Sequence, residues 1–357
     1  MSDTLISILI PIYNHRKYVG TCLDSIYHDA YPEIEVIAID DGSTDDSWDV
    51  VEAWRAAHPG RFRSFQTFRQ ANQGVCKTLN RLVSLAQGEF LVPLASDDHL
   101  LLGGLGLRVD ALRQHPEWLA LFCDSVPIDE LGRPLGQSAM RYLYKANKKA
   151  LCRPEFISPE LILHWSVPGP GVMLRRETFD ESIGVGLYDE RLRLVEDRDF
   201  YLRLLARDAL GFVDATTAAY RTVATGTSRN PALRSDVTKA LYISNASHIQ
   251  EFTGLSRIGL RLIAWYCLIS DRYHTGGGPM AALAYGAIRV ALRAVYMFHT
   301  ARVHISLCYG GRHARTESVR GPGKLERVER HDSVPRQPSA ERLSELPGNR
   351  VRQRVGG

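Results

Sequence analysis

The sequence predicts an α/β protein with a doubly wound, mainly parallel sheet that carries helices on both faces. Short runs that are apolar throughout alternate with segments whose apolar residues recur at helical spacing. Apolar runs without polar alternation are typical of parallel strands buried on both faces. Polar clusters follow three of these runs, and open α/β sheets bind their ligands at the carboxyl ends of their strands.

Strands and helices alternate along the first hundred residues. The predicted strands cover residues 5–10, 35–39, 62–68 and 89–94, and the predicted helices cover residues 18–27, 47–57 and 74–86. Pro32, Pro59 and Gly88 follow the three helices, as expected of residues that interrupt helical periodicity. The βαβαβαβ order with short connections favours a parallel sheet.

Shorter elements follow, and the chain then becomes helical. We expect a strand at 119–126, a polar loop or hairpin at 127–147, helices at 154–163 and 177–179, a loop rich in Pro and Gly at 165–171, a strand at 172–174 and a helix from 196 onward. Residues 258–270 and 281–308 are helix-rich. We find no clean run of about twenty apolar residues that would span a membrane.

The polar clusters at residues 11–14, 40–43 and 96–98 would meet at one edge of such a sheet. Asp97 and Asp98 have two interpretations. They could cap a following helix, or they could hold a divalent cation, because two adjacent buried carboxylates are unfavourable without one. Glu196 and Asp197 are similarly either favoured by a helix dipole or placed as a general base.

Composition excludes several classes of protein. The 357 residues are 45% hydrophobic and 24% charged, as in ordinary globular proteins. The formal charge of +4 comes from residues 312–357, which hold eleven Arg or Lys and six Asp or Glu. We expect this basic tail to be disordered, and we expect no nucleic-acid binding. No GxGxxG or GxxxxGK[ST] motif is present, which argues against dinucleotide and P-loop sites.

The six cysteines are scattered without metal-site spacing, and the first residues lack a signal-peptide pattern. We therefore expect free thiols and a cytoplasmic protein. Arg289 and Arg293 lie four residues apart within the second helix-rich stretch. This stretch is consistent with a helix that lies on the inner face of the cell membrane and with an ordinary helix packed on the domain core.

Several motifs occur together in a specific order. They are Ser7-Ile-Leu-Ile-Pro-Ile-Tyr-Asn14, Val36-Ile-Ala-Ile-Asp-Asp-Gly-Ser43, Asn72-Gln-Gly74 with Asn80, Gly88-Glu-Phe90 before Ser96-Asp-Asp98, Gly171-Val-Met-Leu-Arg-Arg-Glu177 and Glu196-Asp-Arg-Asp-Phe-Tyr-Leu-Arg203. With these motifs the chain resembles glycosyltransferase family 2, of the Rossmann-like GT-A fold, over roughly residues 5–230. The resemblance implies an inverting enzyme that uses a nucleotide-sugar.

The resemblance also implies roles for individual residues. Nucleotide-binding positions are Pro11, Tyr13, Asn14, Asp40, Asp41, Asn72, Gly74, Lys77 and Asp97. Asp98, together with Asp97, is the implied ligand of Mn²⁺ or Mg²⁺. Asp197 is the implied catalytic base, with Glu196 as its neighbour. Gly171, Trp165 and Arg221 are assigned to the acceptor or the transferred sugar.

These roles lead to a chemical expectation. A divalent cation would neutralise the leaving diphosphate, and a carboxylate on the opposite face would deprotonate the acceptor hydroxyl. We expect a uridine or thymidine donor, because the Asp41 carboxylate suits an N–H group of a pyrimidine. The acceptor would be a glycan or a lipid-linked glycan of surface polysaccharide biosynthesis. Leu79 and Val223 stand where many relatives have Arg and His, and neither side chain can contact a metal or a diphosphate through a polar group.

The expected organisation has three parts. Residues 1–235 form the catalytic domain, with a nucleotide-binding half at about 1–100 and an acceptor-binding half at about 101–235. Residues 236–311 form a helical extension, and residues 312–357 form the tail. Two other functions stay open at this point: a catalytically weakened binding protein of the same fold, and a sugar-phosphate nucleotidyltransferase, although the latter lacks its usual Gly-rich loop after the first strand.

Overall fold

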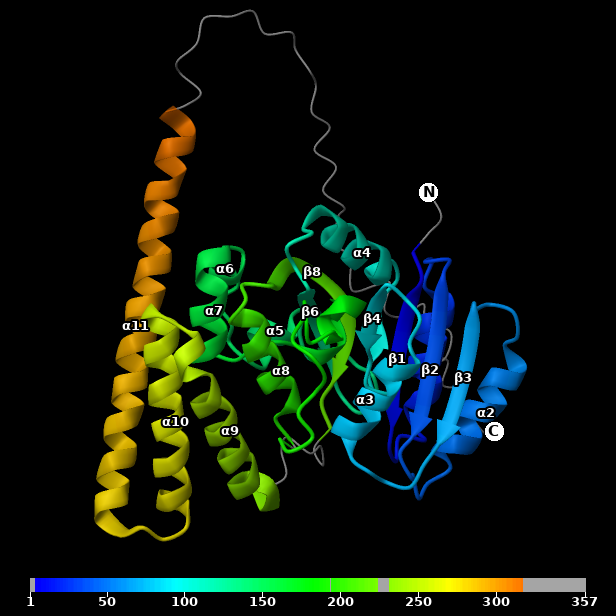
Figure 1. Cartoon of the computed structure of the whole chain (residues 1–357), viewed down its shortest axis with the longest axis horizontal. Helices are drawn as coiled ribbons and strands as arrows, with labels where there is room; N and C mark the ends of the chain where they lie inside the picture. The colour runs from blue at the N-terminus through cyan, green and yellow to red at the C-terminus, as the bar shows by residue number, and fades with distance from the viewer. Residues whose placement is uncertain (1–3, 193, 224–230, 317–357) are drawn as a thin grey trace, which may run out of the picture. The chain divides into compact units, whose positions relative to one another are not determined.

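The computed structural model describes residues 4–192, 194–223 and 231–316. The first four strands of the chain form the parallel part of one sheet (Figure 1). The parallel strands are β1 (Ile6–Ile12), β2 (Ile34–Asp40), β3 (Ser64–Arg69) and β4 (Phe90–Pro93), in the spatial order β3-β2-β1-β4. Their carboxyl ends therefore share one edge, where the predicted polar clusters lie.

The second half of the sheet is mixed. It adds β7 (Val172–Arg175), β6 (Ala120–Ile128), β8 (Leu210–Arg221) and β5 (His99–Leu100), in that spatial order after β4. β7 pairs antiparallel with both β4 and β6, β6 pairs parallel with β8, and β5 pairs antiparallel with β8. The long strand β8 was not predicted, and it contributes Arg221 to the candidate site.

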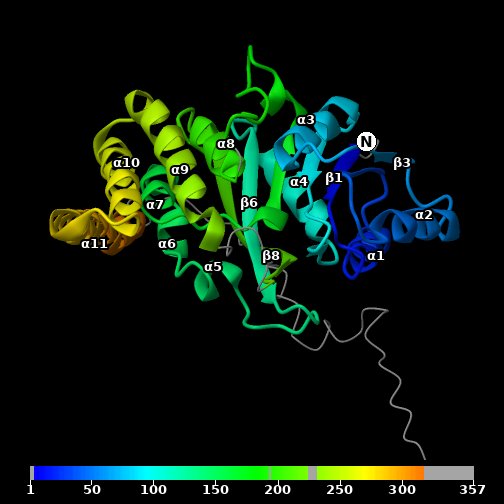
Figure 2. The ribbon, with the colours of Figure 1, turned by 90° about the horizontal axis from the view of Figure 1, so that it is seen from below.

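Helices cover both faces of the sheet, as predicted (Figure 2). The α-helices of the described residues are α1 (Val19–His28), α2 (Ser47–Ala57), α3 (Val75–Leu85), α4 (Gly104–Gln114), α5 (Ala139–Tyr142), α6 (Lys148–Leu151), α7 (Pro154–Leu163), α8 (Glu196–Leu205), α9 (Arg234–His248), α10 (Gly254–His274) and α11 (Gly278–Thr316), of which the last three pack mainly on other helices. Alternate strand residues divide the core: Ile8 packs with α1 and α4, whereas Leu9 packs with α3 and α8. This is the two-sided burial that uninterrupted apolar strands require.

The helices after β8 differ in part from the prediction. α9 was not predicted as a separate helix, and α11 continues to Thr316, into the stretch expected to be disordered. The rest of that tail lies outside the described residues. Gly278–Leu307 is long and apolar enough to cross a membrane by length and average composition alone. Arg289, Arg293 and Arg302 interrupt it, so it still contains no clean run of about twenty apolar residues.

Met1–His304 is one compact unit. Within it, α11 is attached through a buried network on α7. The Glu160 carboxylate lies 2.9 Å from His299 Nε2 and accepts a hydrogen bond of 3.1 Å from the Tyr296 hydroxyl. Tyr296 also contacts His164 at 3.1 Å. One side of α11 is thereby held against the body of the protein.

Candidate functional site

Hydrogen bonds join the loops that follow β1 and β2. The Asn14 N–H donates to Ser43 Oγ (2.9 Å), and the Thr44 N–H donates to Asn14 Oδ1 (2.8 Å). Asn14 has φ +55°, in the left-handed region that Asn tolerates better than most residues. The adjacent Tyr13 side chain is 48% exposed. This loop therefore presents an accessible ring beside a rigidly tied backbone.

Asp41 organises the loop that precedes α3. Its buried carboxylate accepts hydrogen bonds from the Gln70 side-chain amide (2.8 Å) and from the N–H groups of Gln73 (2.9 Å) and Gly74 (2.9 Å). An ionised carboxylate offers about four lone-pair sites. Three acceptances therefore leave room for one further donor at Asp41.

Asp40 and Gly42 fix the end of β2. Asp40 is fully buried, and its Oδ2 lies 3.1 Å from Arg69 Nε on β3. Gly42 has φ +76°, and a Cβ there would lie 2.7 Å from the backbone nitrogen of Asn72. Only glycine fits this close approach without displacing backbone. The loop after β2 and the loop between β3 and α3 are consequently held in contact. The Asn72 residue is exposed there.

Arg221, at the end of β8, holds the Asp97–Asp98 pair. Its N–H donates to Asp98 Oδ1 (2.7 Å), and its Nε donates to the Asp97 carbonyl (2.7 Å). The guanidinium also donates to the Asp129 carbonyl (2.9 Å) and lies 4.6 Å from the centre of the Tyr18 ring. Arg221 is thus a neighbour of the aspartate pair, and much of its hydrogen-bonding capacity is used within the protein.

The aspartate pair is electrostatically strained. Asp98 is buried, and its burial, followed by the charge of Asp97, raises the pKa of the Asp98 carboxyl well above its usual range. His15 Nδ1 lies 2.8 Å from Ser96 Oγ and 3.9 Å from Asp97 Oδ1, which connects the pair to the loop after β1. A bound cation would relieve the repulsion between these carboxylates.

The residues at this position fit a divalent ion in part. Carboxylate oxygens are the ligands that Mg²⁺ and Mn²⁺ prefer. No group of three or more His, Cys, Asp or Glu side chains able to hold a metal occurs within the ranges that the structure describes. An ion between Asp97 and Asp98 would therefore need further ligands, such as phosphate oxygens of a substrate.

Glu196 and Asp197 occupy the first turn of α8. Burial, followed by the charge of Asp197, raises the pKa of Glu196 to about 7. Desolvation also raises the pKa of Asp197, although Asp197 is an exposed residue. These two features are compatible, because a group can touch water and still be surrounded largely by protein atoms. Glu196 Oε2 is buried and has no hydrogen-bond partner among the described residues.

Contacts from α3 connect the region of this pair to the loop that Asp41 holds. Asn80 exchanges two hydrogen bonds of 3.0 Å with the backbone of Tyr188. The Cys76 thiol donates to the Asp189 carbonyl (3.3 Å). Burial, followed by the charge of Glu196, raises the pKa of Cys76 to about 12. Glu196 therefore lies close to the amino end of α3, which begins directly after the loop held by Asp41.

The predicted acceptor residues are in different surroundings. The Trp165 ring stacks on Tyr201 of α8 at 5.8 Å, and the Arg198 guanidinium lies 5.0 Å from the Trp165 ring. Trp165 therefore lies next to the Glu196–Asp197 turn. Gly171 is required by packing, because a Cβ there would lie 2.4 Å from the Cys123 carbonyl of β6.

The structure brings most predicted residues to one sheet edge, and it adds others. Lys77 is exposed on α3. His15 and Gln70 were not predicted, although both bond to predicted site residues or their neighbours. Gln70 follows the end of β3, so the rule that directed attention to polar residues after strands could have identified it.

Comparison with known proteins gives a family match over nearly half of the chain. The sequence model of "Glycosyl transferase family 2" matches residues 7–166. Chondroitin synthase from Escherichia coli is 30% identical over 194 residues, which cover 54% of this chain and 26% of that protein. The putative glycosyltransferase EpsH from Bacillus subtilis is 36% identical over 98 residues, which cover 28% of this chain and 27% of that protein. The chain thus spans only about a quarter of these relatives.

Another relative is matched over more of its length. A PGL/p-HBAD biosynthesis glycosyltransferase from Mycobacterium tuberculosis is 28% identical over 212 residues, which cover 59% of this chain and 73% of that protein.

Solved structures share the fold. S. aureus TarS 1-349 in complex with UDP-GlcNAc aligns with a TM-score of 0.57 at 17% identity, over 86% of this chain and 92% of that one. The mannosyltransferase PcManGT from Pyrobaculum calidifontis, in complex with GDP-Man and Mn²⁺, aligns with a TM-score of 0.55 at 18% identity, over 88% of this chain and 84% of that one. At these identities the likeness shows the fold alone.

Proposed function

We propose that this chain, whose residues 7–166 belong to glycosyltransferase family 2, transfers a sugar from a nucleotide-sugar to a hydroxyl of a glycan or lipid-linked acceptor. The observation that carries the proposal is the set of contacts joining the three acidic clusters. His15 connects Asp97–Asp98 to the loop after β1, and that loop is bonded to the loop after β2. Asp41 holds the loop before α3, and Cys76 and Asn80 of α3 bond to the backbone of Tyr188 and Asp189, which lie shortly before the turn of Glu196.

In this proposal the donor nucleotide binds across the loops after β1 and β2. Tyr13 offers an exposed ring face for the base, and Asn14, Asn72, Gly74 and Lys77 lie on or beside the same loops. Asp41 keeps one acceptor site for an N–H of a pyrimidine, which favours a uridine- or thymidine-linked sugar. The structural relatives were solved with UDP-GlcNAc and with GDP-Man, so donors differ among proteins of this fold.

Asp98 and Asp97 would hold Mn²⁺ or Mg²⁺ together with the donor diphosphate. A divalent ion bound there supplies neutralisation of the charge that develops on the leaving diphosphate. The relative PcManGT was solved with Mn²⁺. Arg221 contributes by fixing both aspartates, since it bonds to the carboxylate of one and the carbonyl of the other.

Asp197 would accept the proton of the acceptor hydroxyl as that hydroxyl attacks the anomeric carbon. Asp197 is an exposed residue, whereas one Glu196 oxygen is buried. A base works best with a pKa near the working pH, and desolvation raises the pKa of Asp197 toward that range. A single displacement by the hydroxyl inverts the anomeric centre and needs no enzyme nucleophile.

The division of the chain follows from these roles. Residues 1–100 would bind the nucleotide, residues 101–235 the acceptor, and residues 236–311 would form an extension that contacts the cytoplasmic face of a membrane. Exposed apolar side chains are concentrated on this extension. They include Ile258, Trp265, Leu268, Met280, Leu283, Val290, Met297 and Phe298. A lipid-linked acceptor of a surface polysaccharide would be reached from such a position.

A donor screen tests the proposal. The purified chain is incubated with Mn²⁺ and a panel of nucleotide-sugars, and mass spectrometry measures the released nucleotide diphosphate. We expect hydrolysis of at least one uridine- or thymidine-linked donor. Nucleotide binding without turnover of any donor would instead support a catalytically weakened binding protein, and it would overturn the proposed transfer.

A further inference from the structure

Residues 131–154, between β6 and α7, hold an unusual concentration of positive charge. This segment contains six Arg or Lys and no Asp or Glu. Three of the six pair with acids outside the segment: Arg133 with Asp129 (2.8 Å), Arg153 with Glu155 (2.7 Å), and Lys148 with Asp124 (2.9 Å) and Asp214. Arg133 and Arg153 lie apart from a pocket that the other four surround.

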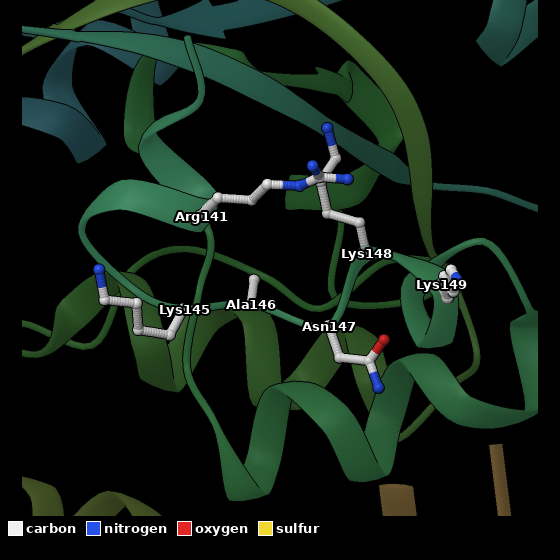
Figure 3. Close-up of a pocket in the computed structure, with 6 residues that line it drawn as sticks. All are labelled: Arg141, Lys145, Ala146, Asn147, Lys148 and Lys149. Carbon is white, nitrogen blue, oxygen red and sulfur yellow. The ribbon is translucent and has the colours of Figure 1, made fainter. Parts of the chain in front are cut away.

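That pocket has a volume of about 300 Å³ and is lined by Arg141, Lys145, Ala146, Asn147, Lys148 and Lys149. We call it the lysine-rich pocket. Figure 3 shows the Arg141 and Lys148 side chains extending toward the same region, while Lys145 points elsewhere. Its volume is at the small end of the range for ligand pockets. It is large enough for a phosphate or carboxylate group and part of the molecule to which that group is attached.

The charges of the pocket are only partly compensated. Lys148 is held by Asp124 (2.9 Å) and by Asp214, and these contacts raise its pKa although burial acts in the opposite direction. The ammonium of Lys145 bonds to the Tyr142 carbonyl (2.9 Å). The Arg141 and Lys149 side chains have no ion pair or hydrogen bond with another residue that the structure describes. Two carboxylates therefore compensate Lys148, whereas the charges of Arg141 and Lys149 are not paired by any described residue, an arrangement that attracts anions.

The pocket is connected to the candidate site through β8. Tyr144, which precedes Lys145, hydrogen-bonds to Tyr220. The next residue, Arg221, donates its N–H to Asp98. An anion in the pocket would therefore be linked to the aspartate pair through two adjacent residues of β8, and it would be distinct from a diphosphate held by that pair.

We propose that the lysine-rich pocket binds an oxyanion of the acceptor, a phosphate or a sugar carboxylate, and so selects acidic acceptors. This inference rests on the proposed transferase function, because it assigns the pocket to the acceptor. Guanidinium and ammonium groups are the usual partners of both oxyanions. Lys148, fixed by two carboxylates, would orient the anion, and Arg141 and Lys149 would supply the uncompensated charge.

The test is calorimetric titration of the full chain with inorganic phosphate and, separately, with glucuronate at low ionic strength. We expect the R141A/K149A variant to bind the preferred anion at least five-fold more weakly. Both substitutions leave the backbone hydrogen bonds of α5 and α6 in place, and thermal melting checks that the variant folds. The control R63A/K239A removes two exposed cations that likewise lack a side-chain partner among the described residues.

Each outcome has a defined meaning. Tighter binding of phosphate identifies a phosphate-bearing acceptor, and tighter binding of glucuronate identifies an acidic glycan. Equal affinity in the unaltered chain and R141A/K149A, equal weakening in the control, or no binding of either anion would overturn the proposal. Donor hydrolysis by the unaltered chain is measured in parallel. Its absence would contradict the transferase function without altering the result for the pocket.

Discussion

At the scale of single residues, the site depends on carboxylates held under unfavourable conditions. Asp98 and Glu196 both have a raised pKa, caused first by burial and then by an adjacent aspartate. Burying these carboxylates in their ionised form lowers the stability of the fold, and such perturbed pKa values are concentrated at functional sites. The acidic pairs themselves were predictable from the sequence. Their partners on β8 and α3 were not, because these elements are distant from them in sequence.

The division of roles between Asp197 and Glu196 gives a first prediction. In D197N the acceptor hydroxyl loses its base, so we expect transfer to fall about 100-fold or more, with nucleotide affinity retained. E196Q should lose far less, because Glu196 does not accept the proton. Initial rates and nucleotide titrations measure both effects. Full activity in D197N would exclude Asp197 as the base.

The raised pKa of Glu196 gives a second prediction, about stability. A carboxyl whose pKa is about 7 in the folded state and about 4.5 in the unfolded state opposes folding increasingly as the pH rises between these values. E196Q removes the ionisable group. We therefore expect E196Q to raise the free energy of unfolding, relative to the unaltered chain, by on the order of 1–3 kcal/mol more at pH 8 than at pH 4.

Chemical denaturation at the two pH values measures this difference. D208N is a suitable control, because it removes an acidic group for which no hydrogen bond or ion pair of the side chain is described. If E196Q raised the free energy of unfolding equally at pH 4 and pH 8, the raised pKa of Glu196 could not be the cause.

At the scale of elements, α11 has two apolar sides. Ile288 and Val303 are buried, whereas Leu283, Val290 and Met297 are exposed and recur every seven residues. Ile288 and Val290 are two residues apart, which turns them about 200° from each other on a helix. A helix attached on one side and apolar on the other suits a membrane surface.

This arrangement gives a third prediction. We expect L283E/V290E to bind vesicles of phosphatidylcholine and phosphatidylglycerol at least about ten-fold more weakly than the unaltered chain, because two apolar side chains leave the interface. Co-sedimentation measures binding. The matched control I183E/L187E alters two exposed apolar residues outside the helical extension. Similar binding by all three proteins, or none by the unaltered chain, would contradict membrane contact through α11.

The elements also show what local patterns can predict. The bounds of α2 and α7 agree with the predicted ranges, because each is flanked by strong signals such as Pro154 and Pro59-Gly60. β8 was missed because its middle carries Asp214, Thr216 and Thr217, which obscure an apolar run. β5 has two residues, too few for any periodicity. The antiparallel insertion of β7 depends on long-range pairing, which local patterns do not contain.

At the scale of the whole molecule, one sheet edge connects the residues that we propose to bind the nucleotide, the metal and the acceptor. The resemblance to glycosyltransferase family 2 could assign these residues to one site, since the order of motifs is specific. It could not show that Asp41 is largely occupied by the loop before α3, or that Arg221 bonds to both aspartates. Such details arise from contacts between residues about thirty to more than one hundred positions apart.

The central claim is that Asp98 lies at the metal end of a transferase site. The most direct test measures turnover of uridine- and thymidine-linked sugars by the unaltered chain and by D98A, with and without Mn²⁺. We expect turnover that requires the metal and falls about 100-fold or more in D98A, because charge on the leaving diphosphate is no longer neutralised. Turnover that is independent of Mn²⁺, or undiminished in D98A, would contradict this claim.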